Sequence, residues 1–343
     1  MIKGLRLKNF KGIKSGEIEL APLTILLGAN NSGKTTVLEA LFLAPNPSRR
    51  VPYNGGSKTA IEVVHEIHKT LSSEGFAFLL NGYVSKRAEI MCRVNGDDYI
   101  LQFIKGDTRI YVSTNKETKS PYATNLYGEK IRFFGELGLS SKEYEFYDES
   151  LFIDNTLLMN SNLVKAAYGY MEENWAFIIN SGICGKVAEE ASVLSPEKYK
   201  NITIEPFLGR KLAVYVLLED GTRIRLGDLG EGIQNYVIAK ILYEVVRPKV
   251  LLWDDVEAHL NPRVLLKLSE WFSNIINEGG QVILTTHSLE AARTIASLSE
   301  EKARISLTFL KDGLLKVKEL TLNEVDDLLK AGVDVRVAEP LLL

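Results

Sequence analysis

Apolar and polar positions in the first third of the chain predict strands with two short helices. Residues 2–27 alternate like half-buried strands and end in a continuous apolar run. Apolar residues at helical spacing follow at 37–42, and a second helix is expected at 61–71. Further antiparallel strands, separated by turn signals, are predicted at 76–80, 89–94, 99–104 and 109–112. The polar stretches 46–58 and 113–130 predict loops.

Helical segments and short buried strands alternate in the rest of the chain. Residues 140–200 are expected to be largely helical, because apolar residues, as in 148–163, recur at helical intervals. Helices are also expected at 232–246 and from Pro262, with Asn261 as the N-terminal cap. Strands are predicted at 212–218, 223–226, 250–253, 281–284, 305–310 and 314–319. Because strands alternate with helices, the predicted fold class is α/β, with a mostly parallel sheet, an antiparallel β subdomain and a helical lobe.

The composition is that of an ordinary globular protein. Of 343 residues, 45% are hydrophobic and 25% are charged, and the formal net charge is -3. This charge creates no field that would attract nucleic acid or an anionic membrane to the whole protein. Cys92 and Cys184 lie far apart, which suits a reducing cytosol. No apolar run has the length of a membrane span, so a soluble cytoplasmic protein without a membrane partner is expected.

Residues 28–36 fit the P-loop pattern G-x-x-x-x-G-K-[ST] and lie between a predicted strand and a predicted helix. In that arrangement, successive backbone N–H groups and the helix N-terminus face a phosphate. Lys34 is expected to reach the β- and γ-phosphates, and Thr35 to bind Mg²⁺ through its hydroxyl. The sequence therefore predicts a site for a nucleoside triphosphate, ATP with Mg²⁺. The predicted nucleotide-contacting residues of the P-loop are Gly28, Asn30, Asn31, Ser32, Gly33, Lys34, Thr35 and Thr36.

The apolar strand predicted at 250–253 ends in two acidic residues, Asp254 and Asp255. An acid placed beside a P-loop can hold the Mg²⁺ that the loop hydroxyl also binds, so Asp254 is predicted as a metal ligand together with Thr35. A neighbouring carboxylate can orient the attacking water or accept its proton. Asp255 and Glu257 are both candidates for this catalytic role. For Glu257, the alternative is a first-turn acid that complements a helix dipole.

Three further features are candidate contacts of the phosphates. The strand predicted at 281–284 leads to His287, and ligands bind at the carboxyl ends of parallel strands, so a catalytic γ-phosphate contact is predicted for His287. A glycine-punctuated turn at 226–234 opens a helix, and a plain helix cap is its equally open alternative. Lys11 belongs to a group of lysines near the N-terminus, which form either a solvated strand face or a contact to the nucleotide.

His65 and His68 have the i, i+3 spacing of metal ligands, but no further ligand lies nearby in the sequence, so a surface pair is favoured. Gln102, in a predicted antiparallel strand, is interpreted as structural, which leaves the Q-loop unassigned.

Taken together, the P-loop, the glycine turn, the acidic strand and His287 resemble the heads of ABC-type ATPases in order and spacing. The segments Leu7-Lys8-Asn9-Phe10-Lys11-Gly12 and 28–35 are similar to the SMC/RecF-like branch rather than to transporters. Residues 254–262 look like that branch's DEPEAHLHP. The resemblance covers nearly the whole chain and is closest to the ATPase part of OLD-type (overcoming lysogenization defect) proteins.

The resemblance implies several roles beyond the P-loop. The turn Gly230-Glu231-Gly232-Ile233-Gln234 matches the ABC signature, which in this family contacts the γ-phosphate held by a second subunit. Gly230, Glu231, Gly232 and Gln234 would therefore bind nucleotide in trans, and ATP would join two heads into a homodimer. Asp255 occupies the position at which the family usually has its catalytic glutamate, and its side chain is one methylene shorter. Gly230 occupies a position at which the family usually has serine. Glu257 matches the family's second acid.

Three functions are weighed. The leading one is a Mg²⁺-dependent ATPase head that dimerises with ATP and acts on a partner protein or nucleic acid in DNA repair or genome defence. The expected partner is a protein such as a nuclease or a toxin-like effector, with DNA as a further candidate. Because Asp255 and Gly230 differ from the residues usual in the family, a second function remains an alternative. It is a nucleotide-gated assembly module with negligible turnover. A transporter ATPase subunit is the third function, and the segment Asn9-Phe10-Lys11 argues against it.

A single head is expected over residues 1–343, in three sub-lobes. Residues 1–135 would hold the P-loop and the antiparallel strands, 136–200 a helical insertion, and 201–343 the signature turn, the acidic strand and His287. No long heptad segment interrupts the chain, so no SMC-type coiled-coil arm is expected, and no TOPRIM nuclease domain is expected after residue 343.

Overall fold

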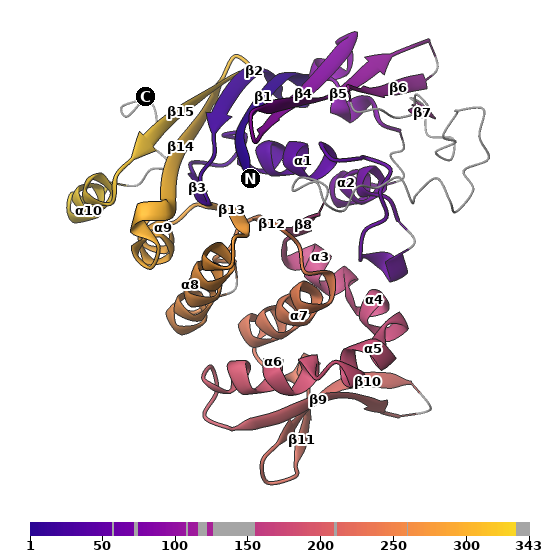
Figure 1. Cartoon of the computed structure of the whole chain (residues 1–343), viewed down its shortest axis with the longest axis vertical. Helices are drawn as coiled ribbons and strands as arrows, with labels where there is room; N and C mark the ends of the chain where they lie inside the picture. The colour runs from indigo at the N-terminus through magenta and orange to yellow at the C-terminus, as the bar shows by residue number, and fades with distance from the viewer. Residues whose placement is uncertain are drawn as a thin grey trace.

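The computed structural model of the chain describes residues 1–56, 58–71, 75–107, 109–115, 122–125, 155–208, 211–258 and 260–333. Figure 1 shows a large sheet with helices beside it, and below it a lobe of helices over a small sheet. Within the described residues, the large sheet has 12 strands in the order β7-β6-β5-β4-β1-β2-β15-β14-β3-β13-β12-β8, and the small sheet has the order β11-β10-β9.

The strands of the large sheet are β1 (Ile2–Phe10), β2 (Ile13–Glu19), β3 (Leu23–Leu27), β4 (Arg87–Val94), β5 (Asp97–Lys105), β6 (Arg109–Thr114), β7 (Tyr122–Asn125), β8 (Thr156–Met159), β12 (Val250–Trp253), β13 (Gln281–Thr286), β14 (Ala303–Lys311) and β15 (Leu314–Leu320). The helices that accompany them are α1 (Lys34–Leu43), α2 (Ala60–His68), α8 (Pro262–Asn277), α9 (Leu289–Ser297) and α10 (Leu322–Lys330). The lobe contains α3 (Ser161–Ala166), α4 (Tyr168–Glu173), α5 (Trp175–Asn180), α6 (Ile183–Ser192), α7 (Glu231–Val246), β9 (Tyr199–Pro206), β10 (Leu212–Leu218) and β11 (Arg223–Arg225).

The half of the large sheet that carries the P-loop is parallel. Strands β14, β3, β13, β12 and β8 pair in parallel in that order. Every residue of β3, β12 and β13 is buried, because α1 packs on β12 and β13 while α8 and α9 also pack on β13. The carboxyl ends of these strands therefore meet at one edge of the sheet, where ligands of α/β proteins bind.

The other half of the sheet is antiparallel, with β1, β2 and β4 to β7 in successive antiparallel pairs. Together with the helical lobe, this confirms the predicted fold class, a P-loop α/β fold with an antiparallel β subdomain. The predicted N-terminal cap at Asn261 is also confirmed, since its side chain accepts a hydrogen bond from the Val264 N–H at 3.0 Å.

Two local predictions in the antiparallel half are wrong. Residues 76–80 do not form a strand but contain a 3₁₀ turn, Ala77–Leu79, in which Phe76 and Leu79 are both buried. Their i, i+3 spacing suits a helical turn, whereas a strand would bury every second residue. The loop predicted at 113–130 is interrupted by β7, which pairs with β6. A polar segment formed this strand because an open sheet edge offered it hydrogen-bond partners.

The prediction of a helix at 148–163 is wrong, because Thr156–Met159 form the strand β8. Leu157, Leu158 and Met159 are buried, and β8 pairs in parallel with β12, Leu158 opposite Leu252. A short apolar run fits a buried strand and a buried helix equally well, so periodicity could not distinguish them. Residues 140–154 lie outside the described residues, as does the boundary at 135. The division into three sub-lobes therefore stays a prediction.

The lobe is built on the small sheet. Helix α6 packs on β9 and covers one face of the sheet, where Ile202 and Val216 are fully buried. Helix α7 packs on α6, α3 and α8 and so connects the lobe to the rest of the head (Figure 1). Among the described residues, no helix has the length and apolar character needed to span a membrane.

Candidate nucleotide-binding site

The P-loop between β3 and α1 depends on backbone conformations that favour glycine. Gly28 has φ 155° and Gly33 has φ 94°. A Cβ at Gly28 would lie 2.6 Å from the carbonyl oxygen of Thr308, so a larger residue would push the loop off β14. Ser32 is buried and its hydroxyl lies 3.0 Å from that of Thr308, which ties the loop to β14. Asn30 and Asn31 are exposed at the tip, and Thr36 is half-buried in the first turn of α1.

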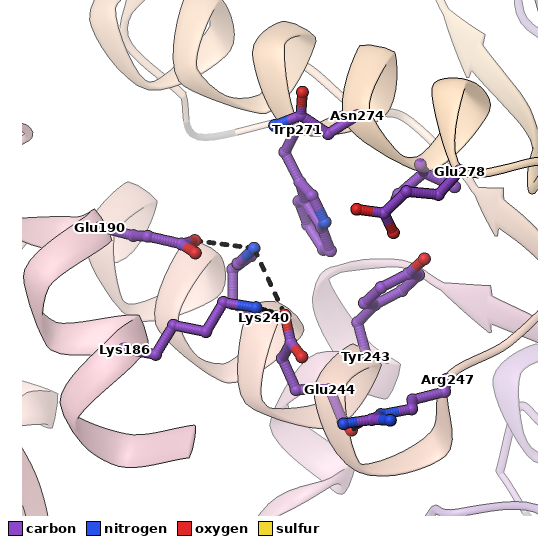
Figure 2. A pocket seen from close by; sticks show the side chains of 10 residues that line it. Lys186, Glu190, Lys240, Tyr243, Glu244, Arg247, Trp271, Asn274 and Glu278 are labelled. Carbon is purple, nitrogen blue, oxygen red and sulfur yellow. Dashed lines mark hydrogen bonds and ion pairs between the residues drawn. The ribbon is translucent and has the colours of Figure 1, made fainter. Parts of the chain in front are cut away.

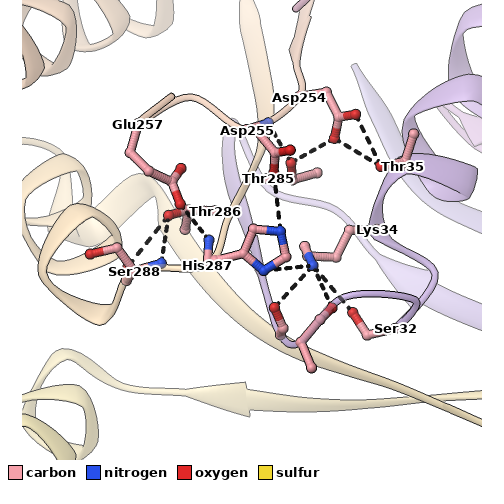
Figure 3. A network of polar contacts seen from close by, with 12 residues as sticks. Ser32, Lys34, Thr35, Asp254, Asp255, Glu257, Thr285, Thr286, His287 and Ser288 are labelled. Carbon is pink, nitrogen blue, oxygen red and sulfur yellow. Dashed lines mark hydrogen bonds and ion pairs between the residues drawn. The ribbon is translucent and has the colours of Figure 1, made fainter. Parts of the chain in front are cut away.

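Lys34 lies folded into the P-loop (Figure 3). Its side-chain ammonium donates to the carbonyl oxygens of Gly28 at 2.9 Å and Ala29 at 2.8 Å. It also lies 3.4 Å from His287 Nδ1. A buried ammonium needs such acceptors, and a phosphate oxygen is a stronger acceptor than a peptide carbonyl. The loop therefore holds this lysine at the place where a phosphate would accept its hydrogen bonds.

Thr35 and Asp254 form the oxygen-rich corner of the site. The Thr35 hydroxyl donates to both carboxylate oxygens of Asp254, at 3.1 and 3.0 Å, although the two residues are far apart in sequence. Thr285, at the end of β13, donates to Asp254 Oδ1 at 2.7 Å. Burial raises the pKa of Asp254 to about 6, and the neighbouring Asp255 carboxylate adds to this. A hydroxyl and a carboxylate are the hard oxygen ligands that Mg²⁺ prefers, so these residues fit the predicted metal.

The raised pKa of Asp254 predicts a stability difference for Asp254→Asn. The pKa of Asp254 in the folded state, about 6, exceeds the usual 3.8, so the ionised carboxylate lowers the free energy of unfolding. The loss is at most roughly 3 kcal/mol at a pH above the folded-state pKa. It vanishes at a pH below the unfolded-state pKa, where the carboxyl group is protonated in both states. We expect the metal-free variant to be more stable than the wild type at about pH 8, with the gain fading towards pH 4. Urea unfolding over this range measures it. Mg²⁺ should stabilise the wild type but not the variant. If the difference in unfolding free energy between the two proteins does not change with pH, the explanation by the raised pKa is wrong.

Asp255 and His287 face each other across the ends of β12 and β13. His287 Nε2 lies 3.2 Å from Asp255 Oδ1, while its Nδ1 faces the Lys34 ammonium. Both contacts are satisfied by one neutral tautomer, in which Nε2–H donates to Asp255 and Nδ1 accepts from Lys34. Asp255 has φ 50°, an uncommon conformation for aspartate, and half of its side chain is exposed. This carboxylate is thus open to water beside the P-loop lysine.

Glu257 lies behind His287 rather than in the open site. Its Oε1 accepts the His287 backbone N–H at 2.6 Å, linking the loop after β12 to the loop after β13. Its Oε2 is buried and has no hydrogen-bond partner within the described part of the chain. A buried carboxylate oxygen without a partner is costly, so Glu257 carries a local penalty in stability.

Lys11 lies in the β1–β2 turn with φ 51°. Its ammonium forms an ion pair with the buried carboxylate of Glu39 on α1 and lies 2.8 Å from His68 Nε2. His68 also contacts Glu39, whereas His65 packs against the ring of Phe76 at 5.2 Å. His68 is exposed and His65 half-buried, so the two lie at the surface as favoured, each with a neighbour. A nucleotide contact by Lys11 stays a prediction, since it would require exchange of Glu39 for a phosphate.

The signature-like turn lies at the start of α7, with Gly230 as its cap. Glu231 pairs with Lys165 of α3 at 2.9 Å, and Gln234 donates to the Leu229 carbonyl at 2.6 Å, which stabilises the turn. The nucleotide contacts of this turn stay a prediction for a second subunit. Gln102 bonds to Glu89 of the neighbouring strand at 2.9 Å, in agreement with a structural role.

Two residues of the site escaped the sequence analysis. Thr285 accepts the Asp255 N–H at 2.8 Å and donates to Asp254, so it orients both acids. The sequence feature that could have identified Thr285 is its position at the end of an apolar strand, immediately before Thr286 and His287. Glu39 follows Thr35 by one helical turn on α1 and is fully buried. A glutamate inside an otherwise apolar helix segment was the available signal, because buried carboxylates are rare unless paired.

Comparison with known families assigns the chain to a family. The family described as "AAA domain, putative AbiEii toxin, Type IV TA system" matches residues 23–292, from β3 to α9. The chain belongs to this AAA family. The match includes the P-loop, the three acids Asp254, Asp255 and Glu257, and His287, whereas Lys11 lies outside it.

Relatives of this AAA protein agree with that assignment. The ATP/GTP phosphatase of Helicobacter pylori is 23% identical over 336 residues, 88% of this chain and 89% of that protein. The DNA replication and repair protein RecF of Chlamydia caviae is 35% identical over 100 residues, 26% of this chain and 26% of RecF. The Smc head domain of Pyrococcus furiosus, solved with the C-terminal domain of ScpA, has a TM-score of 0.57 at 14% identity over 96% of this chain and 98% of that chain.

This AAA protein is therefore an ATPase, and its fold is that of an ABC-type head of the SMC/RecF/OLD-like branch. The resemblance stated from the motifs is confirmed. At 14% identity, the likeness to the Smc head concerns the fold and not the partner or the reaction.

Proposed function

We propose that the chain is a Mg²⁺-dependent ATPase whose ATP-bound form dimerises and acts on a partner protein. The observation that carries the proposal is the meeting of Lys34, the Thr35–Asp254 pair and the Asp255–His287 pair at one edge of three parallel strands. These groups supply a phosphate contact, a metal site and a water-activating carboxylate within one connected network (Figure 3).

Each residue has a distinct task in this proposal. Lys34 exchanges its carbonyl partners for phosphate oxygens, and the N–H groups at the start of α1 face the same phosphates. Thr35 and Asp254 would hold Mg²⁺, which would supply neutralisation of the phosphate charge. Asp255, the exposed acid, orients the attacking water and accepts its proton. His287, neutral with Nε2–H towards Asp255, keeps that carboxylate aligned and lies next to the γ-phosphate contact of Lys34.

Glu257 is assigned a positioning role. Its carboxylate already accepts the His287 backbone N–H, so it keeps the β13 end in place, whereas Asp255 is the acid that water can reach. This argument favours Asp255 over Glu257 as the general base.

Dimerisation is supported by the signature-like turn. Gly230 caps α7, so the turn carries the positive end of the helix dipole. A helix N-terminus complements an anion, and in the proposed dimer that anion is the γ-phosphate bound by a second copy.

The partner and the biological setting are inferred from the relatives. A partner protein is proposed by analogy of fold alone, since the Smc head was solved in complex with the C-terminal domain of ScpA. The toxin–antitoxin system in the description of the family supports genome defence as the setting, and the likeness to RecF, a replication and repair protein, supports DNA repair. DNA is therefore a further candidate partner.

Dimerisation can be tested by light scattering. In an Asp255→Asn background, where turnover is blocked, ATP but not ADP should raise the dimer fraction, because a ligand that binds the dimer better shifts the association equilibrium. Replacing Gly232, in the first turn of α7, with arginine should abolish this shift and leave the ATP affinity of the monomer unchanged. A mass that ATP does not alter over a wide range of protein concentration would refute the proposed dimer.

A further inference from the structure

A cavity of about 470 Å³ lies between α6, α7 and α8, and none of its lining residues belongs to the nucleotide site (Figure 2). Its volume falls in the range of pockets that bind ligands or anchoring side chains, roughly 300 to 1,000 Å³. Helices α6 and α7 contribute charged side chains, Arg247 and Glu278 add charges just after α7 and α8, and α7 and α8 add aromatic rings. The cavity therefore offers both polar and apolar contacts.

One wall of the cavity is a closed set of ion pairs. Lys240 Nζ lies 2.7 Å from Glu190 Oε2, and Lys186 Nζ lies 2.7 Å from Glu244 Oε1. The Lys240 ammonium also lies 4.7 Å from the ring centre of Trp271. These four charges cancel one another. They stabilise the contact between α6 and α7 and are not free for a ligand.

Two exposed charges of the rim remain without such a partner. Arg247 follows α7 and Glu278 follows α8, and neither takes part in an ion pair within the described ranges. The guanidinium of Arg247 makes a long hydrogen bond, 3.4 Å, to the Glu244 carbonyl. Figure 2 shows the two side chains on different sides of Tyr243. A ligand that complements this rim carries a carboxylate and a cation, separated by a group that covers the aromatic ring.

The aromatic part of the cavity provides that apolar contact. The rings of Tyr243 and Trp271 are perpendicular, with centres 5.2 Å apart, and Trp271 is 5% exposed. Burial, together with the Glu278 and Glu244 carboxylates, raises the pKa of Tyr243 to about 12, so its hydroxyl remains a hydrogen-bond donor. Tryptophan, tyrosine and arginine in a partly buried pocket are the residue types that dominate binding energy in protein interfaces.

The same rings touch the elements of the nucleotide site. Trp271 lies edge-on to Trp253, with centres 6.2 Å apart, and Trp253 immediately precedes Asp254. Helix α7, which carries Lys240 and Tyr243, begins at the signature-like turn. An occupant of the cavity would therefore contact α7 directly and would be separated from β12 by the ring of Trp271.

We propose that this cavity is the docking site for a segment of the partner protein. An apolar side chain of that segment packs on Tyr243, whose ring is backed by the nearly buried Trp271. An acidic residue on one side of it pairs with Arg247, and a basic residue on the other side pairs with Glu278. The assignment rests on the partner-binding part of the proposed function and specifies the surface and the chemistry of the partner.

A displayed library of short random peptides, selected on the full chain without nucleotide, tests the assignment. Enriched peptides should carry an apolar residue between an acid and a base, and a synthetic copy should bind in calorimetry. Arg247→Gln and Glu278→Gln should each weaken this binding by about tenfold or more. Glu270→Gln, a matched change on an exposed part of α8 outside the cavity, should leave it unchanged.

A charge exchange gives the sharpest outcome. In the double variant with Arg247→Glu and Glu278→Lys, the original peptide should lose affinity, and the peptide with its acid and base exchanged should bind instead. The assignment is overturned if no peptide is enriched or if the enriched peptides bind all variants equally. Because nucleotide is absent, a failure of ATP-dependent dimerisation would leave this result unaffected, and the two proposals can fail separately.

Discussion

Replacing Asp255 with asparagine is expected to leave ATP bound and to lower kcat by about a hundredfold or more, the effect of losing a general base. Asparagine has nearly the same shape and can still accept a hydrogen bond from His287 Nε2, 3.2 Å away in the wild type, so the site should stay assembled. It cannot accept a proton from water. Steady-state phosphate release measures the loss, and calorimetry with ATP checks that binding is retained.

The matched comparison is Glu257→Gln. Glutamine preserves an oxygen that can accept the His287 backbone N–H, now bonded at 2.6 Å, so a positioning role predicts a much smaller loss of turnover. It also removes the charge from the oxygen that is buried without a partner among the described residues. If Glu257→Gln abolishes turnover while Asp255→Asn does not, the general base is Glu257 and the assignment to Asp255 is wrong.

The second large effect is expected from Lys34→Ala. Lys34 is 4% exposed inside the P-loop. A charge-assisted hydrogen bond to phosphate contributes about 1.5–3 kcal/mol, so ATP affinity should fall by roughly tenfold to a hundredfold or more. Calorimetry with ATP measures the affinity, and a melting curve verifies that the variant is folded. Lys3→Ala, which removes an exposed lysine of β1, is the control and should bind ATP normally. If the folded Lys34→Ala variant binds ATP with unchanged affinity, the assignment of residues 28–36 as a P-loop is wrong.

Local sequence features determined much of the site. The P-loop was recognisable because its glycines meet conformational demands within a short segment, φ 155° at Gly28 and φ 94° at Gly33. Asp254 and His287 were identified because each ends a short apolar strand, and parallel strands bring their carboxyl ends to one edge. The helices at α7 and α8 followed from periodicity and, for α8, from the Asn261 cap.

Pairing between distant segments could not be obtained in this way. The β8 strand was mistaken for a helix because its apolar run has no period of its own, and its conformation is set by the neighbouring β12. Likewise, a polar stretch became β7 through pairing with β6. In both cases the hydrogen-bond partners that select the strand lie on another part of the chain.

The sequence by itself determined the family of the site, its P-loop, the acid Asp254 predicted to bind a metal, and His287, since each depends on residues close together in the chain. Only the tertiary structure decided how the two remaining acids differ. Asp255 is exposed and faces His287 Nε2, whereas Glu257 is turned back to the His287 backbone. It also decided that Lys11 pairs with Glu39 and that α6, α7 and α8 enclose a cavity. Exposure and partners depend on packing between segments that the chain brings together only on folding, and no local pattern records that packing.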